Sequence, residues 1–195
     1  RAGVGYLHVI DYDIVEYSNL NRLAFGYNRY AGLAKTEAFT DAAREINPAI
    51  QIVSEKSLFS AESAAKIIAR ECSFHADCID SLSPKVNLIA SLHMEHLVFI
   101  SSMGTAGRIM PESLRLGKMQ EVKGCPLARA LRQRLSKLAI PFDFPVVWSD
   151  EPPIKPIYLE GKRRRIQGSM PFVPQSAGHI MASWIVRTIL KKQSL

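Results

Sequence analysis

The sequence predicts an α/β protein in which a mainly parallel sheet is covered by helices on both faces. The prediction rests on two observations. Apolar segments typical of buried strands alternate with segments of helical spacing through the first half of the chain, and two of the strand-like segments end in acidic residues. Because ligands of open α/β sheets bind beyond the carboxyl ends of the strands, these acids also predict where a binding site lies.

The first half of the chain supplies four strands and three helices to this prediction. Apolar runs predict strands at 7–11, 49–56, 76–80 and 97–103. Helical spacing predicts helices at 32–46, 60–72 and 83–96, the first of them ended by Asn47 and Pro48. Ser60 is a typical helix cap and Pro84 suits a first helical turn, so two of the helix starts are also marked in the sequence.

The second half of the chain has a different character. A basic helix is predicted at 124–138, with its leucines on one face at Leu127, Leu131, Leu135 and Leu138. The stretch from 140 to 174 is rich in proline and predicts short strand pieces and loops. A final apolar helix is predicted at 176–192, where cations in the last turn suit the helix dipole.

Composition limits the class of protein further. The chain has 195 residues and a net charge of +7, which favours an anionic partner such as nucleic acid. The densest basic run, at 162–165, predicts an exposed loop. Three cysteines without a C-x-x-C pair argue against a disulfide framework and a four-cysteine zinc site, so we expect no zinc. No apolar run is long enough to span a membrane, and we expect a cytoplasmic protein.

The segment "VIDYDIVEYSNLNR" at 9–22 carries the first group of candidate site residues. Asp11 ends a predicted strand, where an acid can accept hydrogen bonds from ribose hydroxyls. A glycine-rich phosphate loop normally precedes such an acid by about 20 residues, so we expect that loop before Arg1. Asn19 and Asn21 can orient a ribose or phosphate without adding charge.

Charged residues that suit a nucleoside triphosphate follow at Arg22, Lys35 and Asp80. Arginine offers a fork of donors to phosphate oxygens, and lysine offers a point charge. Asp80 ends another predicted strand and is placed to hold Mg²⁺, which prefers one or two carboxylates together with phosphate oxygens. Each residue alone is more typical of a turn or a solvated surface, but their order along the chain favours a shared site.

That order resembles the ThiF/MoeB/HesA adenylating family, relatives of the ubiquitin-activating enzymes. The resemblance rests on "VIDYDIVEYSNLNR", "GLAK", "INP" and "ADCIDS". It implies a Rossmann-like fold and an ATP and Mg²⁺ site that adenylates a carboxylate and releases pyrophosphate. It also implies a homodimer, for which the final helix and the "SSMG" strand are candidate contacts. The adenylation part would be 1–107, lacking its first strand and phosphate loop in the chain shown, and 108–195 would complete the same domain.

The resemblance also assigns expected roles to single residues. Asp11 resembles the ribose-binding acid and Lys35 the phosphate-binding lysine. The other implied roles are phosphate contacts for Ser18, Asn19 and Arg22, with Arg22 acting in the transition state, a Mg²⁺-linked carboxylate for Asp80, and motif positions of less defined role for Asp13, Asn21 and Ser81.

Motifs of the second half narrow the resemblance. "SSMGTAGRIMPESLRLG", "CPLARALRQRL" and "GSMPFVPQSAGHIMAS" resemble the branch of this family that dehydrates threonylcarbamoyladenosine in tRNA. The implied partners are tRNA and a cysteine desulfurase system. Two alternatives stay open, namely an enzyme that adenylates the C-terminal glycine of a ubiquitin-like sulfur-carrier protein, and a truncated binding protein without catalysis.

Cys125 permits two interpretations. A thiol just before a helix, with Lys123 nearby, can have a lowered pKa and act as a nucleophile. The alternative is a packing residue at a helix start beside Pro126, and we favour it because the implied dehydration needs no catalytic cysteine.

Overall fold

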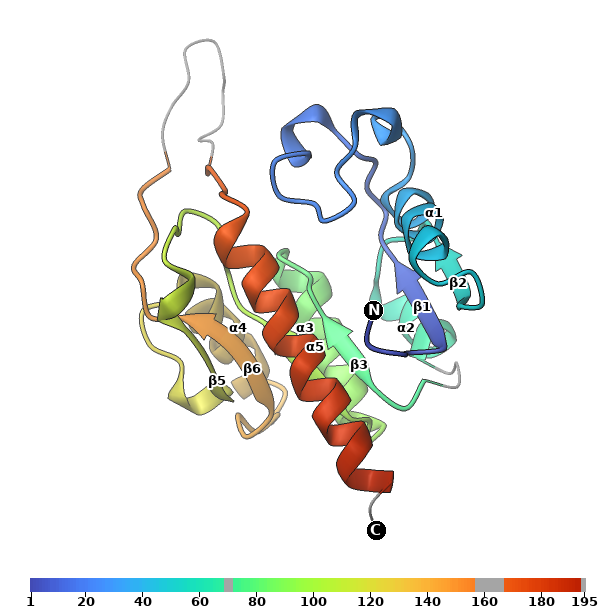
Figure 1. Cartoon of the computed structure of the whole chain (residues 1–195). Coiled ribbons are helices and arrows are strands. Elements are labelled where there is room, and N and C mark those ends of the chain that lie inside the picture. The colour runs from blue at the N-terminus through green and yellow to red at the C-terminus, as the bar shows by residue number, and fades with distance from the viewer. Residues whose placement is uncertain (69–71, 157–166, 194–195) are drawn as a thin grey trace.

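The computed structural model describes residues 1–68, 72–156 and 167–193. It confirms an α/β fold of mainly parallel strands covered by helices (Figure 1). The basic run predicted as an exposed loop at 162–165 lies outside the described residues.

The described strands form two hydrogen-bonded ladders. The first pairs β1 (Tyr6–Ile10) in parallel with β2 (Gln51–Glu55), and α1 (Lys35–Ile46) connects them. The second has the order β3 (His75–Asp77), β4 (Phe99–Ser102), β6 (Pro145–Ser149) and β5 (Leu114–Lys118). In the described part of the chain no strand pairs with both β1 and β3. Strands that share backbone hydrogen bonds lie about 4.8 Å apart. β1 and β3 share none, so they belong to different ladders.

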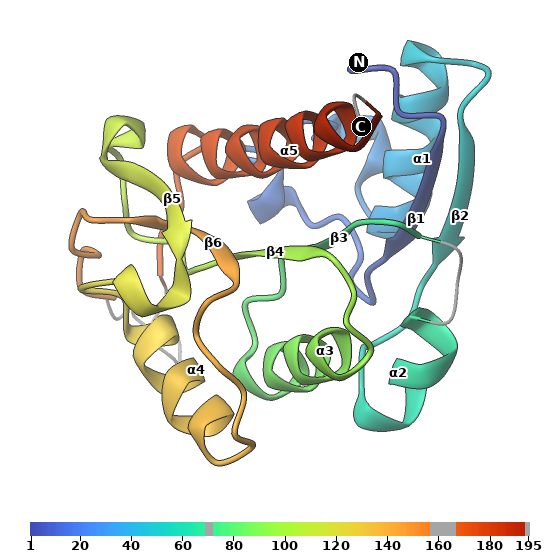
Figure 2. The ribbon, with the colours of Figure 1, turned by 90° about the horizontal axis from the view of Figure 1, so that it is seen from below.

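Helices cover the second sheet on both faces (Figure 2). One face packs against α3 (Leu82–Met94) and α4 (Pro126–Ser136), and the other packs against α5 (Phe172–Gln193). Val146 contributes to the core on the α3 and α4 side and Val147 to the core under α5. This division follows from the strand period of two, which sends successive side chains to opposite faces.

Most predicted elements are present, with differences of extent at several ends. α5 begins at Phe172, four residues before the predicted start at 176. α1 begins at Lys35 rather than at 32, because Gly32 has a φ of 90°, which a helix does not accommodate. β3 ends at Asp77, so Asp80 stands three residues beyond its strand rather than at its end. α4 ends at Ser136, which leaves Leu138 half exposed instead of on the buried leucine face.

α2 matches its prediction as far as it is described, whereas β5 was not expected. The helix predicted at 60–72 is α2 (Ala61–Ile68), and residues 69–71 lie outside the described ranges. The edge strand β5 was not predicted. It runs antiparallel to β6, with Leu116 opposite Val147, and only its first three residues, Leu114 to Leu116, alternate between apolar and polar, which is too short a pattern to predict a strand. The second sheet therefore contains strands from both sides of Gly107, and the division of the chain at 107 stays a prediction.

None of the described helices is both long and apolar enough to cross a membrane.

Candidate functional site

The loop between β1 and α1 folds back on itself and brings its two ends together. Asp11 follows β1, and its Oδ1 accepts a 2.9 Å hydrogen bond from the amide of Asp13, which turns the chain sharply. Ile14 then pairs with Ala34, and the amide of Lys35 donates to the carbonyl of Asp13 at 3.0 Å. The end of the first strand and the start of the first helix therefore meet, although 24 positions separate Asp11 from Lys35.

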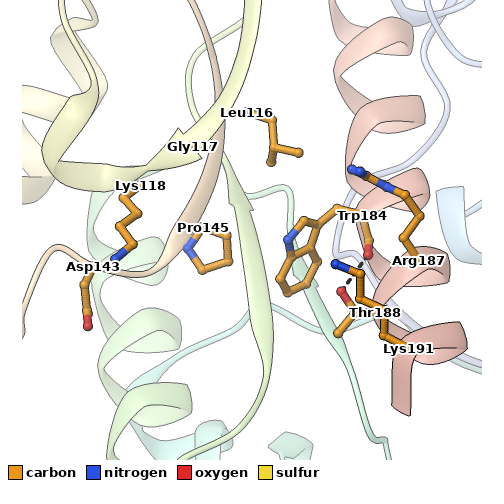
Figure 3. A pocket seen from close by; sticks show the side chains of 9 residues that line it. All are labelled: Leu116, Gly117, Lys118, Asp143, Pro145, Trp184, Arg187, Thr188 and Lys191. Carbon is orange, nitrogen blue, oxygen red and sulfur yellow. Dashed lines mark hydrogen bonds between the residues drawn. The ribbon is translucent and has the colours of Figure 1, made fainter. Parts of the chain in front are cut away.

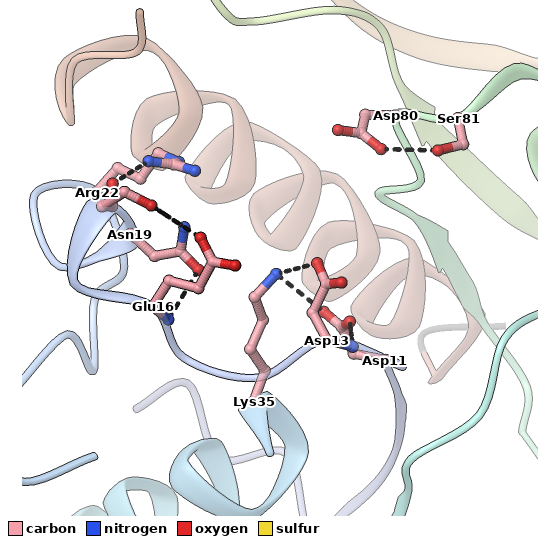
Figure 4. Close-up of polar contacts among 9 residues, drawn as sticks. Asp11, Asp13, Glu16, Asn19, Arg22, Lys35, Asp80 and Ser81 are labelled. Carbon is pink, nitrogen blue, oxygen red and sulfur yellow. Dashed lines mark hydrogen bonds and ion pairs between the residues drawn. The ribbon is translucent and has the colours of Figure 1, made fainter. Parts of the chain in front are cut away.

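Lys35 forms the charged centre of this junction (Figure 4). Its Nζ lies 2.6 Å from Oδ2 of Asp13 and 3.8 Å from Oδ2 of Asp11. The lysine side chain is 19% exposed, whereas those of Asp11 and Asp13 are 36% and 43% exposed. An anion can therefore approach Lys35 from solvent by replacing Asp13. The amides at the amino end of α1 would add to that attraction.

A short 3-10 turn, Tyr17–Asn19, organises the polar residues that follow. Asn19 is 8% exposed, and its Oδ1 accepts a 3.3 Å hydrogen bond from the amide of Glu16. Ser18 donates its hydroxyl to Oε2 of Glu16 at 3.1 Å. In this arrangement Asn19 stabilises the turn, and Ser18 remains at the surface beside it.

Arg22 is held by the same turn and by its neighbour. Its Nη1 donates to the carbonyl of Ser18 at 2.7 Å and to Oδ1 of Asn21 at 3.3 Å. A guanidinium has five N–H donors, so these contacts orient Arg22 and leave donors for a ligand.

Two hydrogen bonds join this segment to the far end of the chain. Nδ2 of Asn21 donates to the carbonyl of Ser169 at 2.8 Å, and Nε2 of Gln175 donates to the carbonyl of Arg22 at 3.3 Å. Sequence reasoning missed Ser169 and Gln175. No local pattern marks contacts across 148 and 153 positions, although both residues lie in the "GSMPFVPQSAGHIMAS" motif.

Asp80 and Ser81 form a separate pair. The hydroxyl of Ser81 donates to Oδ1 of Asp80 at 3.3 Å, and Ser81 is the cap of α3. Figure 4 shows this pair apart from the cluster around Lys35. Among the described residues, no hydrogen bond or ion pair connects Asp80 with Lys35 or Arg22, and none connects Arg22 with Lys35. Direct contacts therefore divide the predicted site residues into three groups, around Lys35, around Arg22 and around Asp80.

A buried ion pair lies directly beneath the loop that carries Asp80. Both Lys85 and Asp77 have fully buried side chains, and Nζ of Lys85 lies 2.8 Å from Oδ2 of Asp77. Lys85 also donates to the carbonyl of Ile79 at 2.8 Å, and Ser101 donates its hydroxyl to Oδ2 of Asp77 at 2.6 Å. The amide of Ile79 completes the set with a 3.0 Å hydrogen bond to Oδ1 of Asp77. The residue before Asp80 is thus fixed through both its amide and its carbonyl.

Sequence reasoning did not identify Lys85, because a lysine in a first helical turn normally faces solvent. The available signal was the acid at the end of β3, which needs a partner when the strand is buried.

Cys125 is 3% exposed and packs in the core beneath α3 and α4, which confirms the packing interpretation. Within the described ranges, no group of three or more His, Cys, Asp or Glu residues is placed to hold a metal ion. The absence of zinc stays an expectation, since this covers only part of the chain.

Mainly parallel strands, helices on both faces of the second sheet, and a polar loop beyond the carboxyl end of β1 are the architecture of doubly wound α/β proteins, which bind ligands such as nucleotides beyond their strand ends. More narrowly, the chain belongs to the ThiF family, whose model matches residues 1–195.

Similar proteins of known activity support the same grouping. A tRNA threonylcarbamoyladenosine dehydratase of Bacillus subtilis is 26% identical over 98% of this chain and 80% of its own length. The Escherichia coli protein of the same name is 31% identical over 75% of this chain, an alignment that spans only 53% of that relative. A molybdopterin-synthase adenylyltransferase of Salmonella typhimurium is 33% identical over 51% of this chain and 40% of its own length.

Solved structures of the Escherichia coli dehydratase TcdA share the fold closely. The complex with AMP superimposes with a TM-score of 0.90 at 26% identity, over 98% of this chain and 78% of that one. The complex with ATP gives a TM-score of 0.88 at 25% identity over the same shares.

Proposed function

We propose that this chain is the core of an ATP-dependent enzyme that removes one water from threonylcarbamoyladenosine in tRNA. The observation that carries this conclusion is the similarity to dehydratases over 98% of the chain, including both halves. The loop that follows β1 supports it, because this one loop carries Asp11, Arg22 and the start of the helix with Lys35 beyond a strand end.

The proposed reaction has two steps. A carboxylate oxygen of the threonyl group attacks the α-phosphorus of ATP, and pyrophosphate leaves. A nitrogen of the same modified nucleoside then attacks the activated carbonyl, loses its proton and closes a five-membered ring. AMP leaves and carries away the carboxylate oxygen that had attacked phosphorus. ATP becomes AMP and pyrophosphate, and the nucleoside loses the elements of water.

The chain's residues would act by positioning and by charge. Asp11 would accept hydrogen bonds from the ribose, while Lys35 would exchange Asp13 for a phosphate oxygen. Arg22 would neutralise charge that develops on the phosphates in the transition state, held in place by Ser18 and Asn21. Asn19 would keep the turn in shape.

Asp80 is the residue best suited to a Mg²⁺ ion that accompanies ATP. Its carboxylate is exposed, and Ser81 occupies only one of its oxygens, which fits the preference of Mg²⁺ for few carboxylates and many phosphate or water oxygens. When bound, the ion would neutralise phosphate charge. Asp80 would have to approach Lys35 and Arg22 through the ligand they share, since no direct contact joins them.

The dehydration assay tests the proposed function directly. The full-length protein should reduce the mass of threonylcarbamoyladenosine in tRNA by one water when ATP and Mg²⁺ are present. Mass spectrometry of the tRNA nucleosides after incubation measures this, and a reaction without ATP is the control.

The same experiment separates the alternatives. If tRNA is unchanged but a ubiquitin-like protein gains AMP at its C-terminal glycine, the sulfur-carrier function replaces the proposed one. If neither substrate reacts although the phosphate loop is intact, both enzymatic alternatives fall, and the truncated binding protein is the alternative that remains. The cytoplasmic location and a cysteine desulfurase partner are further parts of the proposal.

A homodimer is the expected assembly. Sedimentation of the full-length protein at micromolar concentration should show a dimer, and a monomer that still turns over ATP would contradict it. Of the two contacts expected from the sequence, the "SSMG" segment offers little surface, because Ser101 and Met103 are almost fully buried and only Ser102 and Gly104 are partly exposed. The final helix, where Phe172 is 52% exposed, remains the candidate contact.

A further inference from the structure

A pocket remote from the Asp11 and Lys35 loop has no role in the function proposed above. Its volume is about 430 Å³, within the range of small-ligand sites, and it lies between the edge strand β5 and the carboxyl half of α5 (Figure 3). Its chemically distinctive lining residues are Leu116, Lys118, Asp143, Trp184, Arg187 and Lys191.

The pocket carries an excess of positive charge. Lys118 stands on the β5 side, and Arg187 and Lys191 stand on the α5 side, while Asp143 is the only acid among the lining residues. Among the described residues, no carboxylate forms an ion pair with any of these three cations. Nε of Arg187 donates to the carbonyl of Ser183 at 3.3 Å, which directs the arginine along the helix. Cations on two facing walls, none of them paired with a carboxylate of the described residues, favour an anion between them.

The same pocket contains an aromatic surface. Trp184 packs partly on the core formed by Ile100, Val147 and Met181, and its indole also lines the pocket between the two groups of cations. Leu116 on the edge strand is 37% exposed and adds apolar surface. An aromatic ring flanked by cations is the combination that holds a nucleic-acid strand, with a base on the ring and phosphates on the cations.

We propose that this pocket docks an RNA strand, with a base against Trp184 and the flanking phosphates between Lys118 and the pair Arg187 and Lys191. The inference rests on the proposed function, which supplies an RNA substrate. Thr188 in the pocket lies 13 positions along α5 from Gln175, a separation of about 20 Å in a helix. A single nucleotide cannot span that distance, whereas a folded RNA can reach both places.

The test measures RNA binding without ATP. An unmodified tRNA transcript should bind the double variant Arg187→Ala/Lys191→Ala about tenfold more weakly than the parent protein. The slope of log affinity against log salt should fall by about 1.4–1.8, because each lost phosphate contact contributes about 0.7–0.9. All the substituted side chains are exposed, so the fold should be unaffected.

A matched variant controls for net charge. Arg134→Ala/Lys137→Ala removes two exposed cations from the end of α4 and should leave affinity within about twofold. An equal loss in both variants, or no binding by the parent, would overturn the pocket as a docking site.

Fluorescence tests the contact with the base. The chain has two tryptophans, and Trp148 is 6% exposed, so RNA should quench mainly Trp184. The quench should disappear in Trp184→Phe, and its persistence there would contradict the proposed contact.

The experiments distinguish a failure of the docking proposal from a failure of the proposed function. If the protein dehydrates tRNA but its affinity for tRNA does not change in Arg187→Ala/Lys191→Ala, the pocket is not an RNA-docking site. If tRNA binds at the pocket but is not dehydrated, the proposed reaction is wrong.

Discussion

Replacing Lys85 with methionine should lower the free energy of unfolding by about 3–5 kcal/mol. The substitution preserves most of the side-chain volume but leaves Asp77 as a fully buried carboxylate whose remaining partners are the hydroxyl of Ser101 and the amide of Ile79. Urea unfolding, followed by circular dichroism, measures the loss.

A second variant shows whether the loss comes from the unpaired charge. Lys85→Met/Asp77→Asn removes both charges, and its asparagine can still accept a hydrogen bond from the amide of Ile79. It should recover most of the stability, because replacing a buried pair as a whole is much less costly than removing one partner. If the double variant is no more stable than the single one, the ion pair is not the source of the effect.

Replacing Arg22 with alanine should lower the ATP-dependent turnover of the full-length enzyme by about 10²–10³-fold, with a much smaller change in ATP affinity. The reason is that the proposed contact of Arg22 strengthens as charge develops on the phosphates, and only such contacts raise the rate of the chemical step. Steady-state kinetics, with ATP varied at saturating tRNA, separate the two parameters.

The neighbouring Arg29 provides the control. It stacks on the rings of Tyr27 and Tyr30, at 5.2 and 4.8 Å from their centroids, and has no proposed role in phosphate binding. Arg29→Ala should retain turnover within a few-fold. Equal losses of ATP affinity and turnover in Arg22→Ala would contradict the role given to Arg22.

The sequence predicted those features of the fold that depend on local pattern. Apolar runs marked β1, β2, β3 and β4, and helical spacing marked all five helices to within a few residues at their ends. The errors arose where one backbone angle or a distant strand decides the outcome. Because Gly32 has a positive φ, α1 begins three residues later than its pattern predicts. β5 forms because it can pair with β6, a contact that the sequence of β5 alone does not predict.

The candidate site was predictable in part for the same reason. Asp11, Asp13 and Lys35 meet because a strand end and a helix start are joined by a closed loop, which the motif order indicated. Its supporting contacts were not predictable from pattern. Asn21 meets Ser169 across the fold, and Lys85 is buried because an acid at the end of β3 requires a cation. Pairings of that kind become visible only when tertiary structure is known.

The hydrogen bonds that join Asn21 to Ser169 and Gln175 to Arg22 can form only late in synthesis. Their partners lie 148 and 153 positions away along the chain. At about 5–20 residues per second, a ribosome needs about 7–30 s to progress from one member of each pair to the other. For that interval the emerging loop around Arg22 has no helix α5 to hold it. Any binding of ATP that depends on these two contacts therefore begins only after α5 has been synthesised and has folded against the loop.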